Sequence, residues 1–191
     1  MLPPDDESQP GMKALCASVG QGPWPRKPCP AAPASDMKAS GIRTIIVIDI
    51  AHALHLVLAD VAAIYQKTRN YYWYLRGPHA RDYLRLLGEQ SDELYAMTDE
   101  IGEHLRKMGG QMLPSIGDLA GMRQVPDYDA GAHIEALAAL AELREDNVTL
   151  STRLRKVRKL CEWYHVIETA RRLDAWIDKT QRRKLSLDDA C

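Results

Sequence analysis

The stretch from Leu58 to Gly110 decides the fold, and it reads LADVAAIYQKTRNYYWYLRGPHARDYLRLLGEQSDELYAMTDEIGEHLRKMGG. Within it and just before it, apolar residues recur every three or four positions, which is the pattern of one helix face. Gly77-Pro78 and Gly109-Gly110 are both helix stop signals. The stretch therefore predicts two long helices, about 43–75 and about 80–108, joined by a short turn.

The rest of the chain continues the helical pattern. Residues 109–131 contain five glycines and two prolines, which predicts a long connection with one short helix around 115–122. Two more helices are expected over about 132–160 and 163–183, although no proline or glycine marks the turn between them. Two short turns and one long connection predict an all-α four-helix bundle with one crossover, as in the ferritin-like arrangement, although periodicity alone also permits other bundles.

Three regions follow from composition. Eight of the eleven prolines lie between Pro3 and Pro33, so residues 1–40 are predicted to be a disordered tail. Translation starting at Met12 or Met37 is an open alternative. Residues 41–185 are the predicted helical domain, and 186–191 a short C-terminal tail.

The charge is unevenly distributed. The chain has a net charge of −1, but residues 41–150 carry −6 and residues 151–191 carry +5. This balance argues against a uniformly basic nucleic-acid coat. The first residues do not resemble a signal peptide, and the most apolar stretch, Ile45 to Tyr65, contains Asp49 and Asp60. We therefore expect a cytoplasmic protein.

The same stretch carries a resemblance to the Dps family, ferritin-like proteins that protect DNA during starvation. The matching pieces, in order and without gaps, are Leu58-Ala59-Asp60, Lys67-Thr68-Arg69-Asn70, Trp73, Gly77-Pro78-His79, Arg81-Asp82-Tyr83, Glu89-Gln90, Asp99-Glu100-Ile101 and Gly109-Gly110. Residues 141–147 and 176–180 also look like the family's third and fourth helices. The resemblance implies a hollow homododecamer, Fe(II) oxidation by peroxide between subunits, ferric mineral storage and, in many members, non-specific DNA binding.

The resemblance also places the iron ligands. It implies a histidine before the tryptophan, then a histidine and an acid four residues apart in the second helix, and an Asp-Glu pair from the partner subunit. Imidazole and carboxylate suit iron. In this chain the first three positions are Tyr72, Leu84 and Gly88, and only Asp99 and Glu103 remain.

Two interpretations of this loss stay open. Tyr72 either ligates ferric iron weakly with Asp99 and Glu103, or merely fills the space of the histidine, which we favour. A carboxylate pair that has lost its metal needs a counter-charge. We hypothesise that Arg85, with Arg81, reaches the acids across the subunit interface; the alternative is that Arg85 is an ordinary solvated residue.

Other charged groups suggest further roles. Glu145 and Asp146 match the region that lines the family's three-fold pores, where acids would attract cations, although a solvated helix face is an equal alternative. The run from Arg153 to Lys159 has five cations in seven residues and, with Arg182, Arg183 and Lys184, forms a basic end. Such runs can hold DNA phosphates, but they are more often solvated or subunit-contacting faces.

We therefore interpret the chain as a Dps-like protein that binds and sequesters iron and protects DNA, with ferroxidase activity weakened or lost. Ferroxidase chemistry and iron itself are expected from the resemblance alone. The alternative is a non-catalytic structural or DNA-binding shell subunit that co-assembles with an active paralogue. Nucleoid association is a further possibility, and the sequence leaves the existence of a paralogue open.

Overall fold

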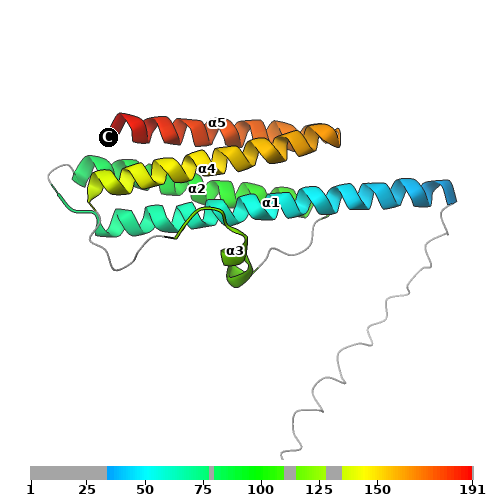
Figure 1. The fold of residues 1–191 in the computed structure, drawn as a ribbon, viewed down its shortest axis with the longest axis horizontal. Helices are drawn as coiled ribbons and strands as arrows, with labels where there is room; N and C mark the ends of the chain where they lie inside the picture. The colour runs from blue at the N-terminus through cyan, green and yellow to red at the C-terminus, as the bar shows by residue number, and fades with distance from the viewer. Residues whose placement is uncertain (1–33, 78–79, 110–114, 128–134, 191) are drawn as a thin grey trace, which may run out of the picture. The chain divides into compact units, whose positions relative to one another are not determined.

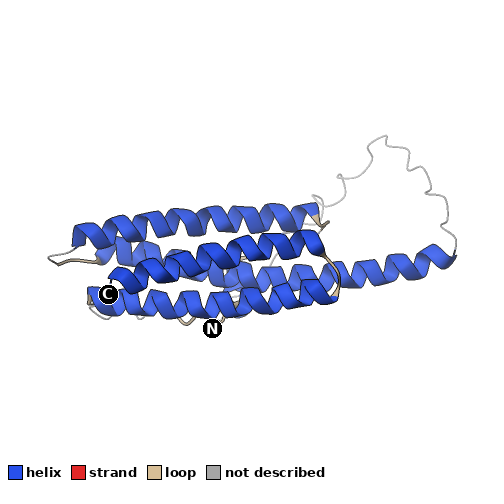
Figure 2. Cartoon of the chain, turned by 90° about the horizontal axis from the view of Figure 1, so that it is seen from above, coloured by secondary structure: helices blue, strands red, loops and turns tan. Residues whose placement is uncertain are grey.

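The computed structural model describes residues 34–77, 80–109, 115–127 and 135–190, and the fold below is that of the unit Lys38–Cys191. Its helices are α1 (Ala34–Tyr74), α2 (Ala80–Lys107), the short α3 (Ile116–Met122), α4 (Ala136–Trp163) and α5 (Ile167–Ala190). The four long helices run side by side, and α3 lies on the connection between α2 and α4 (Figure 1, Figure 2). The predicted all-α bundle with a long crossover and one short helix is confirmed.

The predicted bounds differ from the observed ones mainly at the chain ends. The helix expected from residue 43 already begins at Ala34, so residues 34–40 do not belong to the predicted tail, and residues 1–33 lie outside the described part. The predicted C-terminal tail is wrong, because α5 continues to Ala190. Leu187 is fully buried, so its burial fixes this last turn against the bundle.

Each long helix buries one apolar face in a common core. Fully buried members include Leu54, Val57 and Ile64 of α1, Leu87, Leu94 and Met97 of α2, Leu140, Leu150 and Leu154 of α4, and Leu173 and Leu187 of α5. Polar contacts join α1 to α4, α4 to α5 and α5 to α2. Tyr72 of α1 also meets Gly88 of α2, so each long helix has two neighbours around the core.

Helix α1 is the most apolar element. By length and composition alone, Thr44–Tyr74 could cross a membrane, with a hydropathy of 2.0 over its most apolar window. Core helices of soluble proteins pass the same test, and α1 packs its apolar face against the bundle. It also carries Asp60 and Lys67, which are buried charges that pair with α4 and would be costly in lipid.

A buried ion pair fixes the crossover against α1 and α4. Asp60 Oδ2 lies 3.1 Å from Arg153 Nε, and the two side chains are 0% and 7% exposed. The other oxygen of Asp60 accepts hydrogen bonds from the backbone N–H groups of Gln124 (2.6 Å) and Val125 (3.2 Å). Burial raises the pKa of the Asp60 carboxyl, and these hydrogen bonds and the Arg153 guanidinium act in the opposite direction. The segment after α3 is therefore held in place by a side chain of α1.

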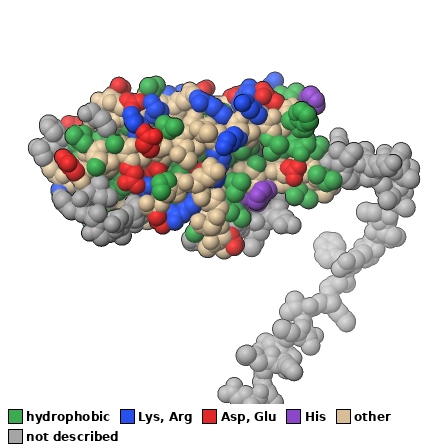
Figure 3. Space-filling model, in the orientation of Figure 1, with side chains coloured by type: hydrophobic (Ala, Val, Ile, Leu, Met, Phe, Trp, Pro, Cys, Tyr) green, Lys and Arg blue, Asp and Glu red, His purple; other side chains and the backbone are tan. Residues whose placement is uncertain are grey.

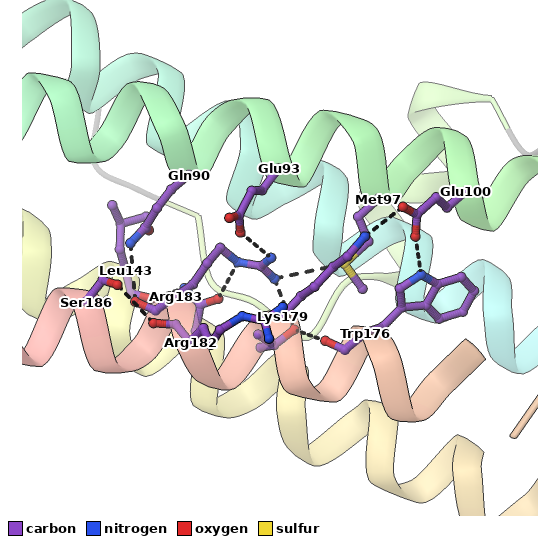
Figure 4. Close-up of polar contacts among 12 residues, drawn as sticks. Gln90, Glu93, Met97, Glu100, Leu143, Trp176, Lys179, Arg182, Arg183 and Ser186 are labelled. Atoms are coloured by element: carbon purple, nitrogen blue, oxygen red, sulfur yellow. Dashed lines mark hydrogen bonds and ion pairs between the residues drawn. The ribbon is translucent and has the colours of Figure 1, made fainter. Parts of the chain in front are cut away.

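A second polar network joins α2 to α5 (Figure 4). Arg183 is buried, donates to Asn147 Oδ1 at 3.2 Å and to Thr180 Oγ1 at 3.0 Å, and lies 3.5 Å from Glu93. Further along the same interface, Glu100 accepts a hydrogen bond from the Trp176 indole N–H (2.7 Å) and pairs with a lysine of α5. One of the arginines of the predicted basic end is therefore an internal residue.

The turn between α4 and α5 is made without glycine or proline. Val166 N donates to Cys161 O (2.8 Å) and His165 N to Glu162 O (3.0 Å), the two hydrogen bonds of a Schellman motif. His165 occupies the left-handed position with φ 55°. Histidine tolerates this region better than most residues, which is why the sequence pattern shows no break here.

We expect His165→Gly to stabilise the protein by about 0.5 kcal/mol, because glycine removes the strain of positive φ but adds entropy to the unfolded chain. His165→Val should lower the free energy of unfolding by about 1 kcal/mol, since a β-branched residue fits this region poorly. Urea unfolding of both variants checks the sign. Equal stability of the glycine and valine variants would contradict the assignment.

Candidate metal centre

Two of the three positions at which the resemblance implies ligands, Tyr72 of α1 and Gly88 of α2, meet where these helices pack together. A Cβ atom at Gly88 would lie 3.6 Å from Cε2 of Tyr72, so the tyrosine ring lies directly beside the glycine. Leu84 is one helical turn before Gly88 on the same face and is partly buried. A Cβ atom at position 88 would therefore be in ordinary van der Waals contact with the ring of Tyr72.

A guanidinium group lies over this ring. The Cζ atom of Arg69 is 5.0 Å from the centroid of Tyr72 and 5.2 Å from that of Trp73, distances typical of cation–π contacts. Its Nη1 atom is also 3.4 Å from Ser91 Oγ, and this hydroxyl donates to the carbonyl of Gly88 at 2.8 Å. A permanent positive charge is thus held against the ring of Tyr72, the first position at which the resemblance implies a ligand.

Sequence analysis missed the role of Arg69, although the residue is part of the motif. The available signal was its spacing of three and four residues from Tyr72 and Trp73, which puts all three on one side of α1. A fixed cation opposes the binding of another cation by Coulomb repulsion. The local arrangement therefore disfavours iron beside Tyr72.

The retained acids lie elsewhere on the protomer. Asp99 is eleven residues beyond Gly88, about 16 Å along α2 at 1.5 Å per residue. Asp99 and Glu103 are both exposed, and Glu103 Oε1 pairs with Lys107 Nζ at 2.7 Å. The hydrogen bond from Lys107 holds the pKa of the Glu103 carboxyl below its usual value. One protomer therefore does not bring the acids to Tyr72.

The two arginines considered as counter-charges are exposed. Arg85 Nη1 lies 3.7 Å from Glu89 within α2, and its side chain is 74% exposed. Arg81 is also exposed. Among the residues that the structure describes, no three histidine, cysteine, aspartate or glutamate side chains are grouped so that they could hold a metal ion. The candidate centre therefore has no complete ligand set within the described part of one protomer.

The two pore candidates differ in exposure. Asp146 is buried, and its Oδ2 atom lies 2.8 Å from Nζ of Lys67. Glu145 is exposed and pairs with its neighbour Arg144. Lys67 also pairs with Glu142 at 2.8 Å, which makes Asp146 part of an internal network between α1 and α4. Only Glu145 of the two has a carboxylate on the protomer surface.

A profile of the ferritin-like domain matches residues 51–189 of the chain. The chain belongs to the ferritin-like family. Its fold is that of Dps proteins: it superimposes on Dps from Thermosynechococcus elongatus with a TM-score of 0.72 and 20% identity, covering 78% of this chain and 93% of that one. Dps from Vibrio cholerae O1 gives a TM-score of 0.72 and 18% identity, covering 76% and 91%.

Antigen TpF1 from Treponema pallidum is similar in both sequence and structure. The sequences are 27% identical over 111 residues, which is 58% of this chain and 62% of the antigen, so the chain matches less than two thirds of this curated relative. The structures share a TM-score of 0.71 and 21% identity, covering 85% and 97% of the two chains. These likenesses show the ferritin-like bundle of Dps proteins.

Proposed function

We propose that this ferritin-like protein forms a Dps-type shell in the cytoplasm that sequesters iron and protects DNA, and that its own ferroxidase activity is weakened or lost. The family and the Dps fold support iron as the substrate; the Vibrio cholerae relative is described as a ferritin-like diiron-carboxylate protein. The loss of oxidation chemistry rests on the local geometry around Tyr72.

The observation that carries the proposal is the contact between Tyr72 and Gly88. The tyrosine ring stands 3.6 Å from where a side chain at position 88 would begin, and Arg69 covers the ring with a permanent charge. A neutral phenol is a poorer ligand for Fe(II) than imidazole or carboxylate. Tyr72 is therefore proposed to fill space, and its role as a ferric ligand is the weaker alternative.

Asp99 and Glu103 are proposed to serve a neighbouring subunit. They lie one turn apart on the exposed face of α2. Both carboxylates can therefore approach the same metal ion, or the same cationic side chain of a neighbouring subunit. In a homo-oligomer, with a dodecamer as the family expectation, they would face Tyr72, Leu84 and Gly88 of the partner. Arginine would then replace iron as the counter-charge, from Arg85 and Arg81 as hypothesised, or from Arg69.

Stopped-flow measurement of Fe(II) oxidation by peroxide tests this proposal. We expect a slow reaction without saturation, because no subunit offers imidazole to Fe(II) at this place. Iron retained by the protein after gel filtration measures sequestration separately. A rapid phase that saturates at a few iron ions per subunit would show that the ferroxidase is intact.

The retained acids also favour a second candidate, a non-catalytic subunit that co-assembles with an active paralogue. In the arrangement that the resemblance implies, Asp99 and Glu103 bind iron at the site of a neighbouring subunit. They could therefore still complete the site of an active paralogue, even though this chain lacks the histidines of its own site. Purification of the native assembly followed by mass spectrometry of its subunits tests this. Shells that contain only this chain would contradict it.

A further inference from the structure

The structure sorts the cations of the basic end into different environments. Arg153 and Arg183 are buried and make internal contacts. Arg158 pairs with one carboxylate of α4 and one of α5. Lys184 pairs with an aspartate of α5 at 2.6 Å. These four cations are therefore engaged within the protomer and are not free to meet a partner.

Three cations of α4 remain on the surface. Arg155, Lys156 and Lys159 are exposed, and none of them makes an ion pair with another residue in the described part of the chain. Their spacing of three and four residues places them on one side of the helix. Arg155 and Lys159 are about 6 Å apart along the axis at 1.5 Å per residue. We call these three residues the α4 cationic face.

The three cations stand on a helix that is anchored in the core, and the exposed Trp163 lies one turn beyond Lys159. Leu154, just before the three cations, and Val157, between Lys156 and Lys159, are buried in the core and hold α4 in place. No carboxylate occurs between Asp146 and Glu162, so the charges are not compensated along the helix. Figure 3 shows Lys and Arg side chains gathered over the α4 and α5 part of the visible surface.

We propose that the α4 cationic face is the docking surface for the phosphate backbone of duplex DNA. This inference rests on the DNA-protecting part of the proposed function and names its site. An uncompensated row of cations fits a polyanion, and each neutralised phosphate releases a counterion. An anionic membrane surface is the competing occupant, because the exposed Trp163 lies one helical turn beyond Lys159 on the same side of α4, and binding to vesicles separates the two.

The test is a salt titration of binding to random-sequence duplex DNA. The variant Arg155→Ala/Lys156→Ala/Lys159→Ala should bind at least tenfold more weakly at low salt, and the slope of log K against log salt should fall by about 3. The matched control is Arg106→Ala/Arg171→Ala/Arg182→Ala, which removes the same charge from exposed positions on α2 and α5. Circular dichroism and gel filtration check that both variants are folded.

Loss of binding in the α4 variant alone supports the proposal. Wild-type binding that the two variants weaken equally, or that neither weakens, overturns it and leaves DNA protection standing. A wild-type protein that binds no DNA at low salt overturns both. Binding to vesicles of anionic phospholipid that the α4 variant alone loses, without DNA binding, would assign the face to a membrane instead.

Discussion

Restoring the missing ligands should restore iron oxidation. The variant Tyr72→His/Leu84→His/Gly88→Asp is expected to oxidise Fe(II) with peroxide roughly 100-fold faster than the wild type, since even supporting groups around a metal change activity 10–100-fold. Two imidazoles and a carboxylate would then face the retained acids of a partner subunit. The rate and the number of irons oxidised per subunit in stopped-flow measurements check the prediction.

Two control variants make this test specific. Gly88→Asp alone should destabilise the fold by about 1 kcal/mol, because its Cβ would already contact the Tyr72 ring at 3.6 Å and the carboxylate beyond it would have to pack against that ring. Adding Tyr72→His should relieve most of this cost. Asp99→Ala/Glu103→Ala in the restored background should abolish the gain. If the triple variant folds and assembles but oxidises Fe(II) as slowly as the wild type, the residues Tyr72, Leu84 and Gly88 are not the cause of the slow reaction.

Removing the buried guanidinium of α4 should have the largest effect on stability. Arg153→Leu is expected to lower the free energy of unfolding by about 3 kcal/mol, because it leaves the fully buried carboxylate of Asp60 without its cation. The loss of stability is limited because Asp60 still accepts hydrogen bonds from the backbone N–H groups of Gln124 and Val125. Burial also raises the pKa of the Asp60 carboxyl, so it can take up a proton. Chemical denaturation at neutral pH measures it.

The neighbouring exposed arginine supplies the control. Arg155→Leu removes the same group from the surface of the same helix and should change the stability by less than about 0.5 kcal/mol. The double variant Asp60→Asn/Arg153→Leu should recover part of the loss, since a neutral amide can still accept the backbone hydrogen bonds of the crossover. Equal effects of Arg153→Leu and Arg155→Leu would contradict the buried pair.

The two charged networks matter for function because they position the site. Asp60 and Arg153 fix the crossover to α1 and α4, while Arg183 fixes α5 to α2 and α4. Through α4 and α5 these contacts connect α1 to α2 indirectly, so we expect them to support the packing in which Tyr72 meets Gly88. A substitution in either network is therefore expected to loosen the candidate centre as well as the bundle.

The periodic apolar residues predicted the helices well, and Gly77 and Gly109 predicted two of their ends. The turn between α4 and α5 was expected about three residues too early, because no glycine or proline marks it: His165 takes the left-handed position, and two backbone hydrogen bonds close the turn. The polar residues at the C-terminus suggested a tail, but α5 continues to Ala190, because Leu187 in its last turn is buried against the bundle. Helix ends depend on tertiary contacts that a local pattern does not contain.

The sequence by itself determined that this protein is an all-α bundle with a long crossover, because helix periodicity is a local property. That Tyr72, Leu84 and Gly88 stand at ligand positions of an iron site is what the resemblance to the Dps family implies, and it stays a prediction. Only the tertiary structure decided which charges are available. Arg153 and Asp146 lie in the same basic or acidic runs as Arg155 and Glu145, yet the first two are buried and the last two exposed. Burial depends on which helix face meets a neighbour, and that follows from packing rather than from composition.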